Sequence, residues 1–460
     1  MLAPLLAAVA LAAGPAHDWT RFGYDAARSS SFPYATGITP ANVHRLRRQR
    51  MDLDGTVDSS PIFLHDVVVG GARHDVFFVT TTYGKTFAID ADSGRLLWRY
   101  VPPGAVSLGG TYRITTATPV ADPSRKAIYA AGSDGVARKL SVADGSQLWA
   151  TAITLLPRRE KIAASFNFSR GRVIATTGGY IGDAPPYQGH VVALNPRTGA
   201  IVHVWNSLCS DRHRLIEPSS CRSSDSAIWA RAGAVAEPGG RLLVATGNAP
   251  WNGRTDWGDS VLELSSDASR LLQSWTPRNQ ASLNQSDLDV GSTAPALLGS
   301  GLAVQGGKDS KLRLLNLRRL NGTAHAGARR GGELQTLPTP GGVDLFTAPA
   351  VWHHGGTSWV FVADGSGTEG LRLVRRRLHR VWQTSAAGTS PVVAGGLLYV
   401  YDPNGGLRVS SPTTGRAITT LPAGAGHWNS PIVVAGRIAL PEGDANEHRQ
   451  SGVLDIYRLP

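Results

Sequence analysis

Short apolar runs, each ended by turn residues, recur along the whole chain. One unit of this pattern contains Ser60-Pro61-Ile62, the apolar run Val76 to Thr80, Thr86 to Asp90, and Ser93-Gly94-Arg95-Leu96-Leu97-Trp98. Runs of this length bounded by Gly, Pro, Asn and Asp are typical of β-strands. A glycine before the last run supplies the positive φ that a tight hairpin needs. Each unit is therefore predicted to form four short strands joined by tight turns.

The unit recurs eight times, which indicates a repeat protein. A chain of 460 residues exceeds the usual size of one core, but a repetitive domain grows by addition. Four-stranded sheets repeated radially close into a ring and leave only short edges. The predicted fold is therefore all-β: an eight-bladed β-propeller of four-stranded antiparallel blades. The units span about 55–100, 109–153, 161–206, 223–277, 288–322, 344–385, 388–422 and 427–460.

Tryptophans close several units, and we expect their side chains to fill the gaps between adjacent sheets. These residues are Trp98, Trp149, Trp205, Trp275 and Trp382. The early segment from Asp18 to Gly23 lies outside the eight units. We expect this N-terminal segment to pair with the last unit and close the ring.

The first sixteen residues have the pattern of a signal peptide. An apolar stretch from Met1 to Ala13 is followed by Gly14-Pro15-Ala16, small residues suited to cleavage after Ala16. No later segment approaches the ~20 apolar residues of a transmembrane helix. We expect a signal peptide at 1–16, a propeller at 17–460 without a transmembrane segment, and a secreted, periplasmic or cell-envelope location.

The chain has two cysteines, Cys209 and Cys221. In an oxidising compartment such a pair favours a disulfide. A metal site that also uses His213 is the weaker alternative, because no fourth ligand is evident.

The formal net charge is +12 and comes mainly from arginine, with runs at 45–50 and 372–380. Such runs attract anionic polymers or lipid headgroups, but solvated strands and loops are the favoured interpretation. No nucleic-acid-binding motif or interleaved aromatic pattern accompanies them, and an exported protein rarely meets a genome. Nucleic acid is therefore not an expected partner.

The segment Ala88-Ile89-Asp90-Ala91-Asp92-Ser93-Gly94-Arg95-Leu96-Leu97-Trp98 resembles the tryptophan-docking repeat of the pyrroloquinoline-quinone (PQQ) propellers. That family includes quinoprotein alcohol dehydrogenases and non-enzymatic scaffold propellers of the bacterial envelope. The resemblance covers nearly all of the predicted mature chain, but a repeat alone implies only a fold.

Four further stretches resemble the cofactor site of the dehydrogenases, in the family's order. By this resemblance, Trp229 is the aromatic floor under the quinone and Asn248 is a calcium ligand. Asp287 is the catalytic base, with Asp289 in reserve, and Lys308 offers a cation to the quinone oxygens. The stretches are Ile228-Trp229, Leu242 to Asn252, Ser286-Asp287-Leu288-Asp289 and Gly307 to Leu312.

These residue types also suit the chemistry. A planar acid stacks on an aromatic ring, and calcium binds oxygen ligands. Oxidation of an alcohol needs a base, and a lysine stabilises negative charge on a reduced quinone. Each residue also has a structural alternative. Trp229 could fill a gap between blades, Asn248 could cap a turn, Asp287 could accept backbone N–H bonds, and Lys308 could lie on a strand edge.

The chain departs from the dehydrogenases in three places. It has no adjacent cysteine pair, and Asp183 is the only acid near the position of the family's calcium-binding glutamate. It also has no Cys-x-x-Cys-His motif, so electrons would pass to a separate acceptor.

Two functions follow from the resemblance. The first is an exported dehydrogenase, dependent on PQQ and calcium, that oxidises an alcohol, polyol or sugar. The second is a non-catalytic propeller that binds protein or cell-envelope partners. A hydrolase is a distant third, since no Gly-x-Ser-x-Gly elbow occurs in a suitable context.

Overall fold

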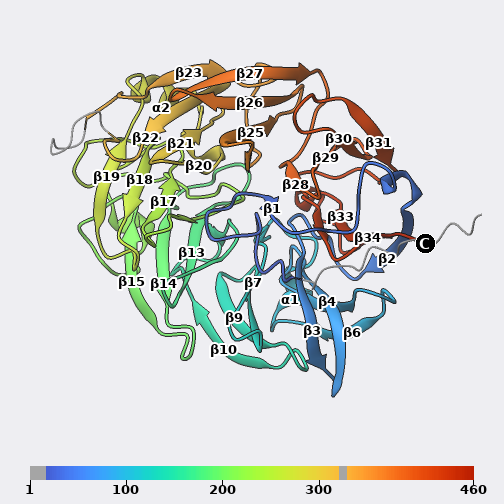
Figure 1. Ribbon diagram of the computed structural model, residues 1–460. Helices are drawn as coiled ribbons and strands as arrows, with labels where there is room; N and C mark the ends of the chain where they lie inside the picture. The colour runs from blue at the N-terminus through green and yellow to red at the C-terminus, as the bar shows by residue number, and fades with distance from the viewer. Residues whose placement is uncertain (1–16, 321–328) are drawn as a thin grey trace, which may run out of the picture.

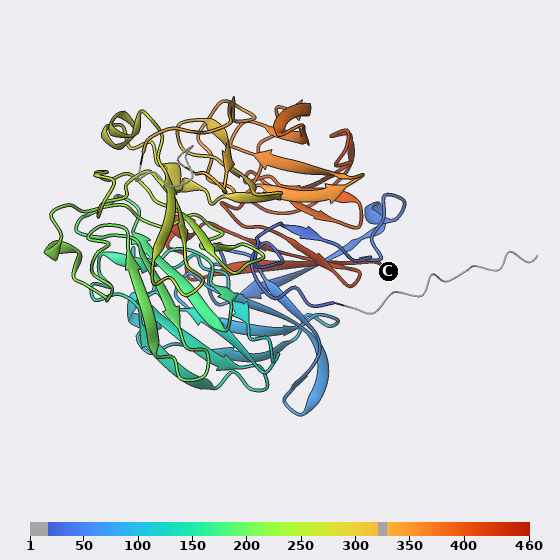
Figure 2. The ribbon, with the colours of Figure 1, turned by 60° about the vertical axis from the view of Figure 1, so that its left-hand side comes forward.

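The computed structural model is a ring of eight β-sheets (Figure 1, and turned by 60° in Figure 2), which confirms the predicted eight-bladed propeller of four-stranded antiparallel blades. It describes residues 17–320 and 329–460, so the predicted signal peptide lies outside the described residues. Each helix of the described residues is too short or too polar to cross a membrane.

The first four blades follow the chain in order. Blade 1 consists of β3 (Ile62–Val69), β4 (Ala72–Thr80), β5 (Thr86–Asp90) and β6 (Leu96–Tyr100). Blade 2 consists of β7 (Val120–Ala121), β8 (Ala127–Ala131), β9 (Val136–Ser141) and β10 (Gln147–Ala152). Blade 3 consists of β11 (Glu160–Ile162), β12 (Asn167–Ser169), β13 (Arg172–Gly179), β14 (His190–Leu194) and β15 (Ile201–Asn206). Blade 4 consists of β16 (Val235–Ala236), β17 (Leu242–Ala245), β18 (Val261–Leu264) and β19 (Leu271–Trp275).

The other four blades complete the ring. Blade 5 consists of β20 (Ala296–Gly299), β21 (Leu302–Gln305), β22 (Lys311–Asn316) and β23 (Gln335–Pro338). Blade 6 consists of β24 (Ala350–His354), β25 (Thr357–Ala363), β26 (Thr368–Val374) and β27 (Arg377–Thr384). Blade 7 consists of β28 (Val392–Ala394), β29 (Leu397–Tyr401), β30 (Leu407–Ser410) and β31 (Ala417–Leu421), joined by β1 (Ser31–Phe32). Blade 8 consists of β32 (Ile432–Val434), β33 (Arg437–Glu442), β34 (Gly452–Arg458) and β2 (Arg47–Leu53).

Short helices occur in the connections. They are α1 (Ala105–Leu108), α2 (Gln280–Gln285) and the 3-10 turns η1 (Val43–Arg45), η2 (Pro218–Ser220), η3 (Val290–Ser292) and η4 (Ala445–Glu447). The fifth unit is longer than predicted, because its outer strand β23 lies beyond position 322.

Closing tryptophans dock blade 1 on blade 2 and blade 6 on blade 7. The indole N–H of Trp98 donates to the carbonyl of Val142, 2.9 Å away, and that of Trp382 to the carbonyl of Pro412, 2.8 Å away. Each ring packs on the glycine of the next blade's outer turn, Gly145 and Gly415, both with positive φ. A methyl group on either glycine would lie 2.6 Å from the ring, so the close approach depends on glycine.

The N-terminal part of the chain closes the ring, but the predicted segment was wrong. Strand β2, not the segment from Asp18 to Gly23, pairs with β34 and supplies the outer strand of blade 8. Arg48 on β2 forms ion pairs with Glu442, at 3.1 Å, and with the fully buried Asp455, at 2.8 Å. The eighth unit lacks an outer strand of its own, so a strand from the start of the chain completes it.

Residues 18–37 instead form a hub that crosses one side of the ring (Figure 1). Side chains of the hub also reach blade 3, where Arg28 donates to the carbonyl of Phe166 at 2.8 Å. The hub therefore binds blades that are far apart in the sequence. Its backbone hydrogen bonds run from Phe63 N to Trp19 O, Ala121 N to Thr20 O, Ala236 N to Ala26 O, Val351 N to Ser29 O, Val393 N to Ser30 O and Gly436 N to Thr36 O.

Candidate active site

One pocket on the side of the ring opposite the hub contains all six residues predicted for cofactor or metal binding and catalysis. It has a volume of about 400 Å³, within the range of small-molecule sites. The six residues, Asp183, Trp229, Asn248, Asp287, Asp289 and Lys308, line it together.

The pocket residues lie in loops that leave the same ends of the strands. Asp183 follows β13, Asn248 follows β17 and Lys308 follows β21. Asp287 and Asp289 lie between α2 and β20. Propeller blades are wedge-shaped repeats, so equivalent loops of successive blades converge at one face. The fold therefore brings together residues that are far apart in the sequence.

Lys308 and two aspartates form the charged side of the pocket. The ammonium Nζ lies 2.5 Å from Oδ2 of Asp289 and 3.2 Å from Oδ2 of Asp287. Asp289 is buried, with 5% of its side chain exposed, and also accepts the backbone N–H of Asn248 at 2.5 Å. The side chain of Asp287 is 60% exposed. Asp289 is thus held in the wall, while Asp287 faces the open space.

Burial and charge shift the proton affinities of this group. Burial alone would lower the pKa of Lys308, but Asp289 raises it, so the lysine stays charged. Burial raises the pKa of Asp289, and the nearby Lys308 lowers it only partly. Burial and the neighbouring Asp289 raise the pKa of Asp259, which lies behind the pocket, to about 8.

Gly247 makes this arrangement possible. A methyl group at that position would lie 2.4 Å from Oδ1 of Asp289 and 3.4 Å from the indole nitrogen of Trp229. The carboxylate of Asp289 can therefore approach the backbone of blade 4 this closely only because residue 247 is glycine, whereas Trp229 would be in ordinary contact with a methyl group there.

An aromatic cluster borders the charged group in the pocket, and part of this cluster was not predicted. Trp229 packs against Phe346 and Trp428, with ring centres 6.0 and 6.1 Å away, and Nζ of Lys308 lies 5.6 Å from its ring centre. Trp229 thus lines the pocket and does not fill a gap between blades. Phe346 and Trp428 come from blades 6 and 8. No local motif marks them, because only ring closure brings them to Trp229.

His427 is a second unpredicted residue of the pocket. Its Nδ1 lies 2.7 Å from Oδ2 of Asp58 and 3.2 Å from Oδ1 of Asp444. Asp58 is fully buried; burial alone would raise its pKa, but Arg231 and His427 hold it well below its usual range. These three groups could bind a metal ion. However, a guanidinium nitrogen of Arg231 lies 3.6 Å from the same oxygen of Asp58 and disfavours a cation there. Asp58 instead orients the histidine, as a buried carboxylate does in a catalytic dyad.

An acidic group lies at the mouth of the pocket. The hydroxyl of Tyr187 donates to Oδ1 of Asp183 at 3.0 Å. Burial, with Asp183 and Asp287 nearby, raises the pKa of Asp225. Several carboxylates therefore share a site in which Lys308 and Lys161 are the lysines among the described lining residues.

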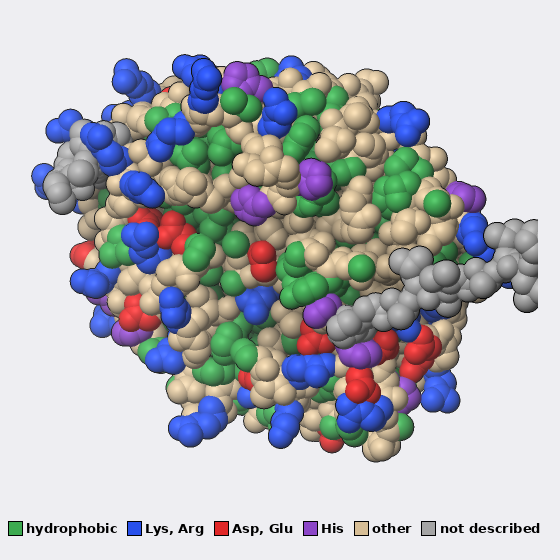
Figure 3. All heavy atoms as spheres, viewed as in Figure 1, with side chains coloured by type: hydrophobic (Ala, Val, Ile, Leu, Met, Phe, Trp, Pro, Cys, Tyr) green, Lys and Arg blue, Asp and Glu red, His purple; other side chains and the backbone are tan. Residues whose placement is uncertain are grey.

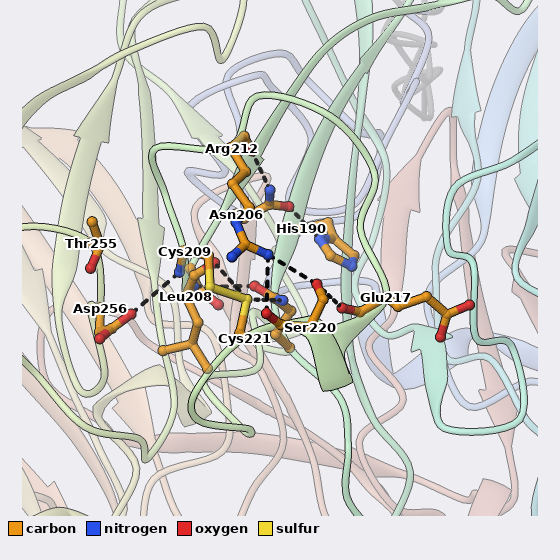
Figure 4. Close-up of a disulfide and its surroundings, with 12 residues drawn as sticks. His190, Asn206, Leu208, Cys209, Arg212, Glu217, Ser220, Cys221, Thr255 and Asp256 are labelled. Atoms are coloured by element: carbon orange, nitrogen blue, oxygen red, sulfur yellow. Dashed lines mark hydrogen bonds between the residues drawn. A yellow bond between two sulfur atoms is a disulfide. The ribbon is translucent and has the colours of Figure 1, made fainter.

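A disulfide joins Cys209 to Cys221 in the loop that leads from β15 toward Trp229 (Figure 4), with the two Cα atoms 6.0 Å apart. The backbone N–H of Cys209 donates to Oδ1 of Asp256 at 3.3 Å, and Arg212 donates to the carbonyl of Ser220 at 3.1 Å. The bridge closes the loop 209–221, and Asp225 and Trp229 follow Cys221 in the chain. It therefore restrains one wall of the pocket.

Replacing both cysteines by serine should lower the free energy of unfolding by about 2–4 kcal/mol, because the unfolded chain regains the entropy of an open loop. Chemical denaturation of the two proteins measures the difference. Thiol titration of the denatured protein, purified without reductant, should find no free thiol, and two free thiols would contradict the bridge.

Comparisons with known proteins support the repeat that was predicted from the sequence. Residues 47–215 match the family model described as outer membrane protein assembly factor BamB. A polyvinylalcohol dehydrogenase from Sphingopyxis sp. (strain 113P3) is 24% identical over 228 residues, which are 46% of this chain and 33% of the relative. The match thus spans about a third of that relative's length.

Solved structures share the ring. The quinohemoprotein alcohol dehydrogenase from Comamonas testosteroni superposes with a TM-score of 0.68 at 16% identity, over 96% of this chain and 80% of that one. A europium-containing methanol dehydrogenase superposes with a TM-score of 0.69 at 15% identity, over 96% and 98% of the two chains. At these identities the likeness shows the fold alone. Residues 47–215 thus carry a repeat like that of the PQQ-type propellers, and the chain has the same ring fold as these structures.

Proposed function

We propose that this chain is an exported dehydrogenase that uses PQQ and a metal ion to oxidise an alcohol, polyol or sugar. The observation that carries the proposal is the convergence of six separately predicted residues on one pocket. The partial likeness to a polyvinylalcohol dehydrogenase supports the same class of substrate.

The residues present fit the cofactor and the metal. Trp229 offers an aromatic face, and Lys308 and Lys161 offer positive charge to a planar tricarboxylic acid. Burial and Arg231 lower the pKa of Lys161 to about 8, and an anionic ligand would favour its charged form. The crowded carboxylates have raised pKa values, and a divalent cation would stabilise their ionised forms. The pocket therefore suits an anionic ring system together with a hard cation.

Each residue then has a role. Asn248 and Asp183 would hold calcium through oxygen atoms. Trp229 would stack under the ring, and Lys308, positioned by Asp289, would face the ring oxygens. Bound PQQ would supply the two-electron acceptor. Asp287 would take the hydroxyl proton of the alcohol, because its carboxylate is the exposed one. The electrons would pass to a separate acceptor.

The decisive experiment is calorimetric titration of the purified chain with PQQ, with and without calcium. We expect binding only when the metal is present, and the pair Trp229→Ala and Asn248→Ala should abolish it. Removal of the aromatic floor costs about 1–3 kcal/mol, and loss of an oxygen ligand weakens the metal further.

A matched control replaces Trp352 and Asn404, which lie outside the pocket, by alanine and should leave binding unchanged. The absence of PQQ binding with either calcium or europium would contradict the proposal. The alternative, a non-catalytic envelope scaffold like the assembly factor named by the family model, would then remain.

A further inference from the structure

The two arginine runs of the sequence lie on one side of the ring, the side crossed by the hub. The first run includes Arg45 and Arg47, where η1 leads into β2 next to β31 of blade 7. The second forms the hairpin between β26 and β27 of blade 6, with Arg375 and Arg376 at its tip. Arg416 lies between them in the outer turn of blade 7. We call Arg45, Arg47, Arg375, Arg376, Arg377 and Arg416 the basic arc; all six are exposed.

Some other arginines on the same side of the ring have carboxylate partners. Arg73 pairs with Asp66, and Arg437 pairs with Asp92. The turns of blades 6 and 7 on this side, 355–356, 375–376, 395–396 and 411–416, contain no Asp or Glu. Within the hairpin, Arg380 pairs with Glu369, while the arginines at the tip extend into solvent. The basic arc is thus part of a rim that carries Lys and Arg side chains all around this side of the ring (Figure 3), and its own turns add no acidic residue.

Acidic residues gather on the other side. Asp58, Asp183, Asp225, Asp287 and Asp289 all lie in the loops around the pocket. An acidic protein that accepts electrons would have to approach that side, because the candidate site opens there. The basic arc faces away from it, so such an acceptor is not the partner that the arc fits.

The start of the described chain also lies on the basic side. His17 stacks on Tyr34 of the hub, with ring centres 3.5 Å apart, and both line a groove beside Gly436 and Arg437. The exposed positive charge of this side suits a flat anionic surface.

We infer that the basic arc docks the propeller on a bilayer containing anionic phospholipids, so that the hub side faces the membrane and the candidate site faces away. Six exposed guanidinium groups offer phosphate oxygens paired N–H donors. The turns that carry them lie at the rim of one side of a ring, so several headgroups can be bound at once. Docking in this orientation leaves the pocket open to substrate. The inference does not depend on the proposed catalytic activity.

The test is co-sedimentation of the purified full chain with two kinds of vesicle, phosphatidylcholine alone and phosphatidylcholine with about one third phosphatidylglycerol. At low salt we expect binding to the anionic vesicles well above binding to the neutral ones, and high salt should remove the difference. The triple variant Arg375→Gln, Arg376→Gln and Arg377→Gln should weaken binding to the anionic vesicles about tenfold or more.

The matched control is the triple variant Arg158→Gln, Arg159→Gln and Arg222→Gln, which removes the same charge from exposed loops on the pocket side. It should bind nearly as the wild type does, and both variants should keep the wild-type melting temperature. If the two variants lost vesicle binding equally, net charge alone would explain the binding. That result would overturn the inference. Equal binding to both kinds of vesicle would also overturn it, as would binding to soluble polyglutamate without binding to anionic vesicles.

Discussion

Replacement of Asp287 by asparagine should lower dye-linked alcohol oxidation by about 10²–10⁴-fold and leave PQQ binding nearly unchanged. The substitution removes the exposed carboxylate that would take the proton. It leaves Trp229 in place, and Lys308 keeps its contact with Asp289 at 2.5 Å. Steady-state kinetics of the enzyme loaded with PQQ and calcium gives the first quantity, and calorimetry gives the second.

His427 provides the competing assignment, because it lines the same pocket and Asp58 orients it. His427→Gln should reduce turnover far less than Asp287→Asn does. A collapse of turnover in His427→Gln, with Asp287→Asn still active, would transfer the role of the base to the histidine.

Replacement of Arg48 by methionine should lower the free energy of unfolding by about 3–5 kcal/mol, because the buried Asp455 loses its counter-charge, while Glu442 keeps its ion pair with Arg50. Arg48 lies between β2 and the rest of blade 8 and contacts both Glu442 and Asp455. Burial and the neighbouring Glu442 raise the pKa of Asp455 to about 7, although Arg48 opposes the shift. Without the arginine, that pKa should rise further.

The sign of the pH dependence follows from this raised pKa. Asp455 has a higher pKa in the folded protein than in the unfolded chain, so the unfolded chain releases this proton first as the pH rises. The free energy of unfolding therefore falls between about pH 4 and pH 7. The loss of unfolding free energy in Arg48→Met, relative to the wild type, should therefore be larger at pH 8 than at pH 5. Urea denaturation at the two pH values measures it, with the exposed neighbour Arg47→Met as the control. Equal deficits in the two variants, or a deficit independent of pH, would contradict the role assigned to Arg48.

The repeats were predictable because each blade is a local pattern. Four short apolar runs, a turn glycine and a closing tryptophan lie within about one unit of sequence, and the tryptophans dock as expected. Strand β2 was not predicted, since Arg47-Arg48-Gln49-Arg50-Met51-Asp52-Leu53 has few apolar residues. Pairing with β34, rather than intrinsic preference, makes this segment a strand.

The candidate site was predictable to the extent that its residues follow the family's order. Asp183, Trp229, Asn248, Asp287, Asp289 and Lys308 could be selected one loop at a time, and the pocket contains them all. Phe346, Trp428, Lys161 and His427 were missed. They reach the pocket from blades 3, 6 and 8, and proximity across a closed ring leaves no signal in the local sequence.

The position of β2 and the hub has a consequence for biosynthesis. Both segments emerge first from the ribosome, yet β2 pairs with Gly452–Arg458, almost the last residues made. The native contacts of residues 18–53 are thus among the most distant in sequence that the chain contains, and such contacts form slowly. Until the C-terminal strand β34 arrives, β2 and the facing edge of β33 in blade 8 stay unpaired and open to aggregation. The ring is therefore completed in one late step, and a chain that ends before residue 452 lacks the strand with which β2 pairs.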